Sequence, residues 1–133
     1  MTYPLITALA AGVLINLQMI LMMYTGMGRY KYRQGLGEGD NPDLLSRIRS
    51  HGNLAENAPI VLIVLGLLEM AGTSRMMIAM AAALFVFGRL MHPLGLFKTH
   101  GASLPRGMGV VTTMLIGMVS GIALFMIALE KLV

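Results

Sequence analysis

RIRSHGNLAENAPIVLIVLGLLEMAG, from Arg47 to Gly72, is the stretch that decides the fold. Its apolar part begins only at Ala58 and would form about 22 Å of helix at a rise of about 1.5 Å per residue. A bilayer core is about 30 Å thick and takes about 20 apolar residues to cross. A membrane-spanning helix here must therefore start earlier and carry the polar run from Arg47 to Asn57 into the membrane.

The composition of the whole chain favours a membrane protein. Of its 133 residues, 56% are hydrophobic and 12% are charged, against roughly 25% charged in soluble domains. A chain this short cannot bury so much apolar surface in its own core, because small domains have little interior for their surface. The excess apolar surface is predicted to contact the lipid bilayer.

Three further apolar stretches, near 4–27, 76–97 and 107–129, meet the length for a membrane span. The predicted fold class is all-α: an integral membrane four-helix bundle forming a single domain over residues 1–133. Its four helices are expected near residues 4–27, 43–72, 75–97 and 106–130.

Residue counts exclude some kinds of site. The chain has no cysteine, which rules out a disulfide framework, a thiolate nucleophile and a cysteine metal site, and no metal site is predicted. Fourteen methionines suit gap filling and lipid contact. The net charge of +4 is interpreted as a topology signal, and nucleic acid is not an expected partner.

The distribution of basic residues predicts orientation in the membrane. The two long loops and their flanks carry most of them: Arg29, Lys31, Arg33, Arg47, Arg49, Lys98 and Arg106. The opposite side has Arg75 and Lys131. By the positive-inside rule, both long loops are expected in the cytoplasm and both termini outside.

A polar stripe runs along the expected second helix. At about 100° per residue, Arg49, Asn53 and Glu56 lie within about 60° of one another, whereas Arg47 and His51 lie on the opposite side. Polar groups at membrane depth cannot face lipid without a penalty of several kcal/mol. Both faces must meet protein or water, which predicts a homo-oligomer with a polar cleft between subunits.

The third helix supplies groups at matching depth. Arg89 lies nine residues before Lys98, so it is expected at the depth of Glu56 and able to pair with it. Such a pair would serve either a binding site or helix packing alone. His92 follows one turn closer to the cytoplasm, before Pro93.

These side chains favour an anionic ligand. Arginine matches carboxylates with two parallel hydrogen bonds, and a buried carboxylate such as Glu56 matches an ammonium group. The predicted ligand is a small zwitterion with more than one carboxylate. The cations that could serve such a ligand are Arg29, Arg33, Arg49, Arg89 and Arg106.

Two motifs resemble those of a known family. RIRSHGNLAENAP, preceded by GLGEGDNPDLL, resembles the second-helix signature of the MAPEG family of membrane-associated proteins in eicosanoid and glutathione metabolism, and GRLMHPLGL resembles its third-helix pattern. The resemblance implies a homotrimer of four-helix protomers that binds glutathione between subunits near the cytoplasm. It also implies attack by glutathione on a lipophilic electrophile or hydroperoxide, and the bacterial-type variant suggests a bacterial inner membrane.

The resemblance also implies roles for residues. Those expected to bind glutathione, as co-substrate, are Arg29, Arg49, His51, Asn53, Glu56, Arg89 and His92. The expected catalytic residue is Arg106, which follows Pro105 and matches the family's thiol-activating arginine after a one-residue shift in the loop. A guanidinium near the sulfur favours the nucleophilic thiolate. Arg106 could equally be an anchor that extends to lipid headgroups.

Two departures leave alternatives open. Asn57 and Leu96 stand where relatives often have tyrosine, so a non-catalytic lipid-binding or scaffolding protein is the alternative function. A small multidrug-type transporter is a third hypothesis, suggested by size. Such transporters need an acidic residue in the first helix, which here has only Asn16 and Gln18 in its interior. Both amides are expected to form interhelical hydrogen bonds.

Overall fold

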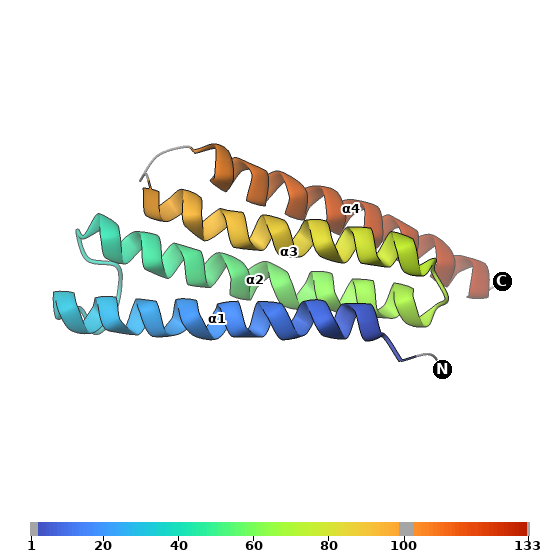
Figure 1. The fold of residues 1–133 in the computed structure, drawn as a ribbon, viewed down its shortest axis with the longest axis horizontal. Coiled ribbons are helices and arrows are strands. Elements are labelled where there is room, and N and C mark those ends of the chain that lie inside the picture. The colour runs from blue at the N-terminus through green and yellow to red at the C-terminus, as the bar shows by residue number, and fades with distance from the viewer. Residues whose placement is uncertain (1–2, 99–102, 133) are drawn as a thin grey trace.

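The computed structural model describes residues 3–98 and 103–132. In this part of the chain the secondary structure is four helices without a strand, which confirms the all-α four-helix prediction. The helices run alternately up and down, with both chain ends at the same end of the bundle (Figure 1). Their bounds are α1 Leu5–Tyr32, α2 Pro42–Met70, α3 Arg75–Lys98 and α4 Leu104–Leu132.

The helix ends follow local chemistry. The side chain of Asn41 accepts a 3.0 Å hydrogen bond from the backbone nitrogen of Leu44, and Pro42 occupies the first turn of α2. α1 continues past the expected end at residue 27 to Tyr32. The added turn is polar, so α1 continues beyond the apolar stretch from which its end was predicted. Arg33 then ends α1 with a left-handed φ of 52°.

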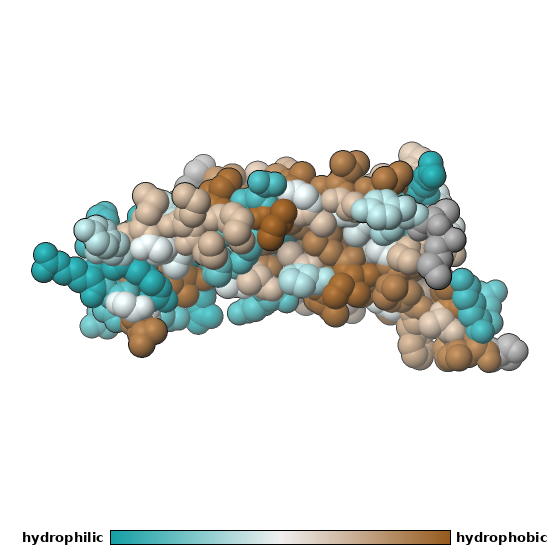
Figure 2. Space-filling view, turned by 90° about the horizontal axis from the view of Figure 1, so that it is seen from below, coloured by the Kyte–Doolittle hydropathy of each residue, from teal (hydrophilic) through white to brown (hydrophobic). Residues whose placement is uncertain are grey.

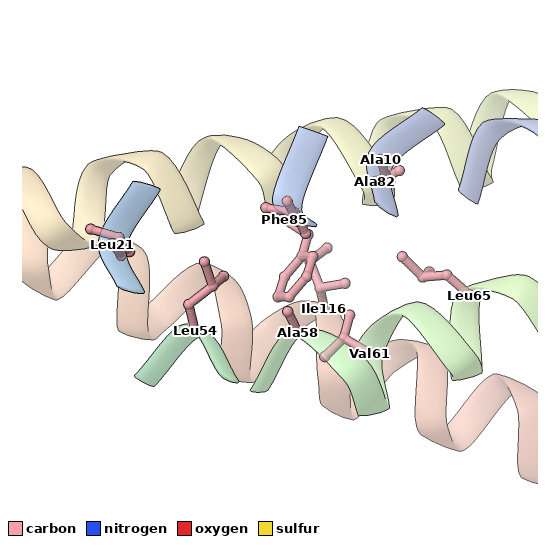
Figure 3. Close-up of a cluster of buried hydrophobic side chains, with 10 residues drawn as sticks. Ala10, Leu21, Leu54, Ala58, Val61, Leu65, Ala82, Phe85 and Ile116 are labelled. Carbon is pink, nitrogen blue, oxygen red and sulfur yellow. The ribbon is translucent and has the colours of Figure 1, made fainter. Parts of the chain in front are cut away.

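Helices α2 and α3 form the centre of the bundle. Each packs against all three other helices, whereas α1 and α4 do not pack against each other in the described residues. The apolar core lies inside the bundle and includes Leu54, Leu65, Phe85 and Ile116, of which Phe85 and Leu65 are fully buried and Phe85 lies next to Ile116 (Figure 3). The long apolar half of α2 is therefore held centrally, and its polar half faces the neighbouring helices at one end.

The outer surface of the bundle is apolar. All four helices are long and apolar enough to cross a membrane, and only 17 to 39% of the most apolar window of each is buried. Hydrophilic atoms gather mainly at the end where α1 leads into α2, while hydrophobic atoms cover much of the middle (Figure 2). This pattern is that of a multi-pass membrane protein in contact with lipid.

A carboxylate joins α2 to the start of α1. Glu69 accepts hydrogen bonds from the backbone nitrogens of Ile6 and Thr7, at 3.0 and 2.9 Å, and from the Thr7 hydroxyl at 2.8 Å. The first N–H groups of a helix have no partner within the helix and carry partial positive charge. Glu69 satisfies two of them and fixes one end of α1 against α2.

Candidate functional site

A pocket of about 480 Å³ lies at the end of the bundle where α2 begins and α3 ends. It is formed by α2, α3, the first turn of α4 and the loop before α2. Its size is within the range of small-molecule sites, about 300 to 1,000 Å³. Its lining includes the ionisable side chains of Glu38, Arg49, Glu56, His92 and Arg106 and the amide of Asn53.

The polar stripe of α2 faces this pocket. Arg49, Asn53 and Glu56 all line it, as their spacing along a helix predicts. The Arg49 side chain is 67% exposed, and one Arg49 nitrogen lies 3.9 Å from a carboxylate oxygen of Glu38. Among the side chains that the structure describes, no basic group forms an ion pair with Glu56. The pocket therefore presents a cation with a loosely held partner and a carboxylate without one.

Arg89 binds differently from the expected pairing with Glu56. It is 2% exposed and donates a 2.6 Å hydrogen bond to the side-chain oxygen of Asn53 and another to the backbone carbonyl of Gly109. Arg89 therefore contacts Asn53, one turn before Glu56 on the same face of α2, and forms no ion pair with Glu56 among the described side chains. Arg89 thus joins α2, α3 and α4 behind the pocket and leaves the NH₂ group of Asn53 to donate to a ligand.

Small residues bring α4 close to α3. A Cβ atom on Gly95 would lie 2.5 Å from the backbone nitrogen of Arg106, and one on Gly109 would lie 2.7 Å from the Cβ of His92. Ser103 also donates a 3.2 Å hydrogen bond to the Gly95 carbonyl. This approach brings His92, which is buried, and Arg106, which is partly exposed, to the same pocket.

Three expected ligands do not line this pocket: Arg89, described above, and Arg29 and His51. Arg29 donates to the carbonyls of Gln34, Gly35 and Gly37 at 3.4, 3.3 and 3.0 Å, so it holds the loop after α1. His51 is partly exposed and does not line the pocket, in keeping with its helical angle relative to Arg49.

Arg47, opposite the stripe, is buried against α1. It pairs with Asp43 at 2.9 Å, donates to the Tyr24 carbonyl at 3.0 Å, and lies 3.7 Å from the centre of the Tyr24 ring. The spacing of Asp43 and Arg47, one helical turn, could have predicted their ion pair. It could not have predicted the contacts of Arg47 with Tyr24 on α1. Helix α1 thus covers the part of this face of α2 that carries Arg47.

The pocket also has residues that sequence reasoning missed. Glu38 comes from the loop, and Leu45 and Ile48 add apolar surface. Leu96, one of the two departures from the family pattern, lines the pocket and is 5% exposed. Asn57, the other, donates a 2.8 Å hydrogen bond to the Asn53 backbone carbonyl.

Among the described residues, the interior amides of α1 form no hydrogen bond to another helix. Asn16 instead donates a 2.7 Å hydrogen bond to the Gly12 carbonyl, one turn back in α1. The side-chain oxygen of Gln18 is buried without a hydrogen-bond partner among the described residues. The expected interhelical bonds are therefore not formed among the residues that the structure describes.

Comparison with known proteins agrees with the family resemblance that the motifs indicate. Residues 7–126 match the sequence model of the MAPEG family. The chain is 37% identical over 67 residues to inner membrane protein YecN of Escherichia coli K12, and equally so to YecN of Escherichia coli O6:H1. The aligned segment is 50% of this chain and 51% of each relative, so the match spans about half the length of these relatives.

Proposed function

We propose, because the chain belongs to the MAPEG family, that it is a membrane-bound glutathione transferase or peroxidase. The observation that carries the proposal is one pocket lined by Arg49, Asn53, Glu56 and Arg106, beside an apolar outer surface. The pocket would hold the water-soluble thiol, and the bilayer would deliver the lipophilic second substrate.

The charges of the pocket match glutathione, which has two carboxylates, one ammonium group and a thiol. Arg49 would bind a carboxylate, since a guanidinium donates two parallel hydrogen bonds to it. Glu56, which has no cationic partner among the described side chains, would bind the ammonium group. The Asn53 NH₂ group and His92 would supply further hydrogen bonds.

Arg106 would act on the sulfur. A nearby guanidinium favours the thiolate, which is the nucleophile. In conjugation, the sulfur forms a bond to the electrophilic carbon, the leaving group departs with its electron pair, and the thiol proton passes to water. In peroxidase turnover, two glutathione molecules are oxidised to the disulfide while a hydroperoxide is reduced to an alcohol and water.

Arg29 and His51 support a homotrimer. Both lie away from the pocket of their own protomer, so they would contact glutathione only if a neighbouring subunit presented them. The family resemblance implies such a shared site. The name of the YecN relatives favours the bacterial inner membrane, and the positive-inside rule favours cytoplasmic loops and termini on the other side.

The proposal is tested with purified protein in lipid nanodiscs. We expect calorimetry to detect glutathione binding and chlorodinitrobenzene to be conjugated with release of chloride, with cumene hydroperoxide as the peroxidase substrate. Arg49→Gln should weaken binding, while Arg75→Gln, on the opposite end of the bundle, should not. Absence of both binding and turnover would refute the proposal.

A non-catalytic lipid-binding function is favoured by Leu96. This side chain lines the pocket where relatives often have a tyrosine, and it adds apolar contact in place of a hydroxyl group. Lipid retained by the pure protein and displaced when Leu96 is replaced by Asn, together with failure to turn over either substrate, would favour this function over the enzyme.

A further inference from the structure

We propose that Glu38 is a built-in competitor for Arg49, which an anionic ligand must displace to enter the pocket. The inference rests on the proposed function for the identity of that ligand as glutathione. It assigns a specificity role to Glu38, a loop residue for which the family resemblance implies no role. The carboxylate of Glu38 both lines the pocket and lies 3.9 Å from the Arg49 guanidinium.

The loop that carries Glu38 is held in place. Arg29 donates to three loop carbonyls, and the Gln34 amide donates a 2.6 Å hydrogen bond to the Leu36 carbonyl. Gly37 and Gly39 flank Glu38 with φ values of 73° and 58°, which side chains rarely adopt. The backbone on both sides of Glu38 is thus turned so that its side chain reaches the pocket.

Competition fits the charges better than a role for Glu38 as a ligand. Glu56 already offers a carboxylate with no cationic partner among the described side chains, so an ammonium group has a site without Glu38. Arg49 is the pocket cation that Glu38 neutralises. A ligand carboxylate that approached Arg49 would meet a like charge and would have to replace it.

The pair is weak enough to exchange. Its two side chains are 67% and 47% exposed, and exposed ion pairs are screened by water and salt. Removing the competitor should therefore strengthen anion binding by about two- to fivefold, the range that exposed ion pairs contribute. The loop would favour ligands whose carboxylate binds Arg49 with both oxygens over those with a single weak contact.

The test compares Glu38→Gln with Asp40→Asn. Both changes remove one negative charge from the same loop, but Asp40 does not line the pocket. By calorimetry in nanodiscs, the dissociation constant of glutathione should fall about two- to fivefold in Glu38→Gln and stay unchanged in Asp40→Asn. An increase in Glu38→Gln would make Glu38 a ligand, and equal effects in both variants would reduce it to bulk charge. Either result overturns the proposal.

A second measurement does not depend on glutathione. Phenylglyoxal modification of Arg49, followed by peptide mass spectrometry, should be faster in Glu38→Gln than in wild type because the carboxylate no longer shields the guanidinium. Succinate, a plain dicarboxylate, should protect Arg49 at about two- to fivefold lower concentration in that variant. If glutathione does not bind but these differences appear, the proposed function fails and the competitor stands. If Arg49 reacts and is protected equally in both proteins, the competitor is refuted.

Discussion

Arg89 on α3 donates a 2.6 Å hydrogen bond to the side-chain oxygen of Asn53 on α2. The same guanidinium is buried and also donates to the Gly109 carbonyl on α4. One arginine thereby connects the three helices that form the pocket and sets the side-chain orientation of a pocket residue. A buried cation depends on such partners, because an unpaired buried charge is strongly destabilising.

Asn53→Ala is expected to destabilise the fold and weaken glutathione binding together. It removes one partner of the buried Arg89 guanidinium, which should lower the free energy of unfolding by about 1 to 3 kcal/mol. Titration with dodecyl sulfate in mixed detergent micelles measures the free energy of unfolding, and calorimetry measures glutathione binding.

The matched control is Asn57→Ala, one turn further along α2. Its amide donates back to the Asn53 backbone carbonyl, so its loss should change the free energy of unfolding by less than about 0.5 kcal/mol. Equal losses in the two variants would contradict the role assigned to Arg89.

Gly95→Ala should displace the start of α4. The added Cβ would lie 2.5 Å from the Arg106 nitrogen, and backbone must move to relieve the contact. We expect a loss of about 1 to 3 kcal/mol in stability and a lower rate of conjugation, since Arg106 moves away from the pocket. Gly117→Ala, where no atom lies within 4 Å, should leave both measurements near wild type.

Arg106→Gln should lower kcat more than it raises KM for glutathione. If Arg106 favours the thiolate, its loss requires a higher pH to reach the same thiolate fraction, so the rise of the rate with pH should move to higher pH. Arg106→Lys should recover part of the rate because it keeps the charge. A headgroup anchor would instead lower the yield of inserted protein and leave the pH profile unchanged.

Glu69→Gln should loosen the start of α1. The carboxylate accepts three hydrogen bonds from Ile6 and Thr7, and an amide offers one acceptor oxygen where the carboxylate offers two. We expect a loss of about 1 to 2 kcal/mol in unfolding free energy and faster amide hydrogen exchange in the first turn of α1. Glu130→Gln, an exposed residue near the end of α4, is the control and should change neither.

Helical periodicity accounts for the part of the site that the sequence predicted. Arg49, Asn53 and Glu56 share one face because they belong to one helix, and the structure places all three at one pocket. Contacts between residues on different helices were harder to predict. The count along α3 placed Arg89 at the depth of Glu56, but depth does not fix the direction around the helix axis, and Asn53 became the partner.

The positions of the loop side chains could not be predicted from helical periodicity. Arg29 turns into a loop anchor and Glu38 enters the pocket because Gly37 and Gly39 take positive φ values. Glycine permits such values, but no helical period predicts which way the loop side chains then point. The shared subunit site, which the sequence also predicts, depends on contacts between protomers and stays a prediction.

The connection of three helices by Arg89 has a consequence for biosynthesis. Translation delivers α2 and α3 to the membrane before α4, so the buried guanidinium must wait for the Gly109 carbonyl of the last helix. A nascent chain arrested after α3 would hold an incompletely paired cation within the bilayer. The buried cation therefore gains its full set of partners only after the last helix has been inserted.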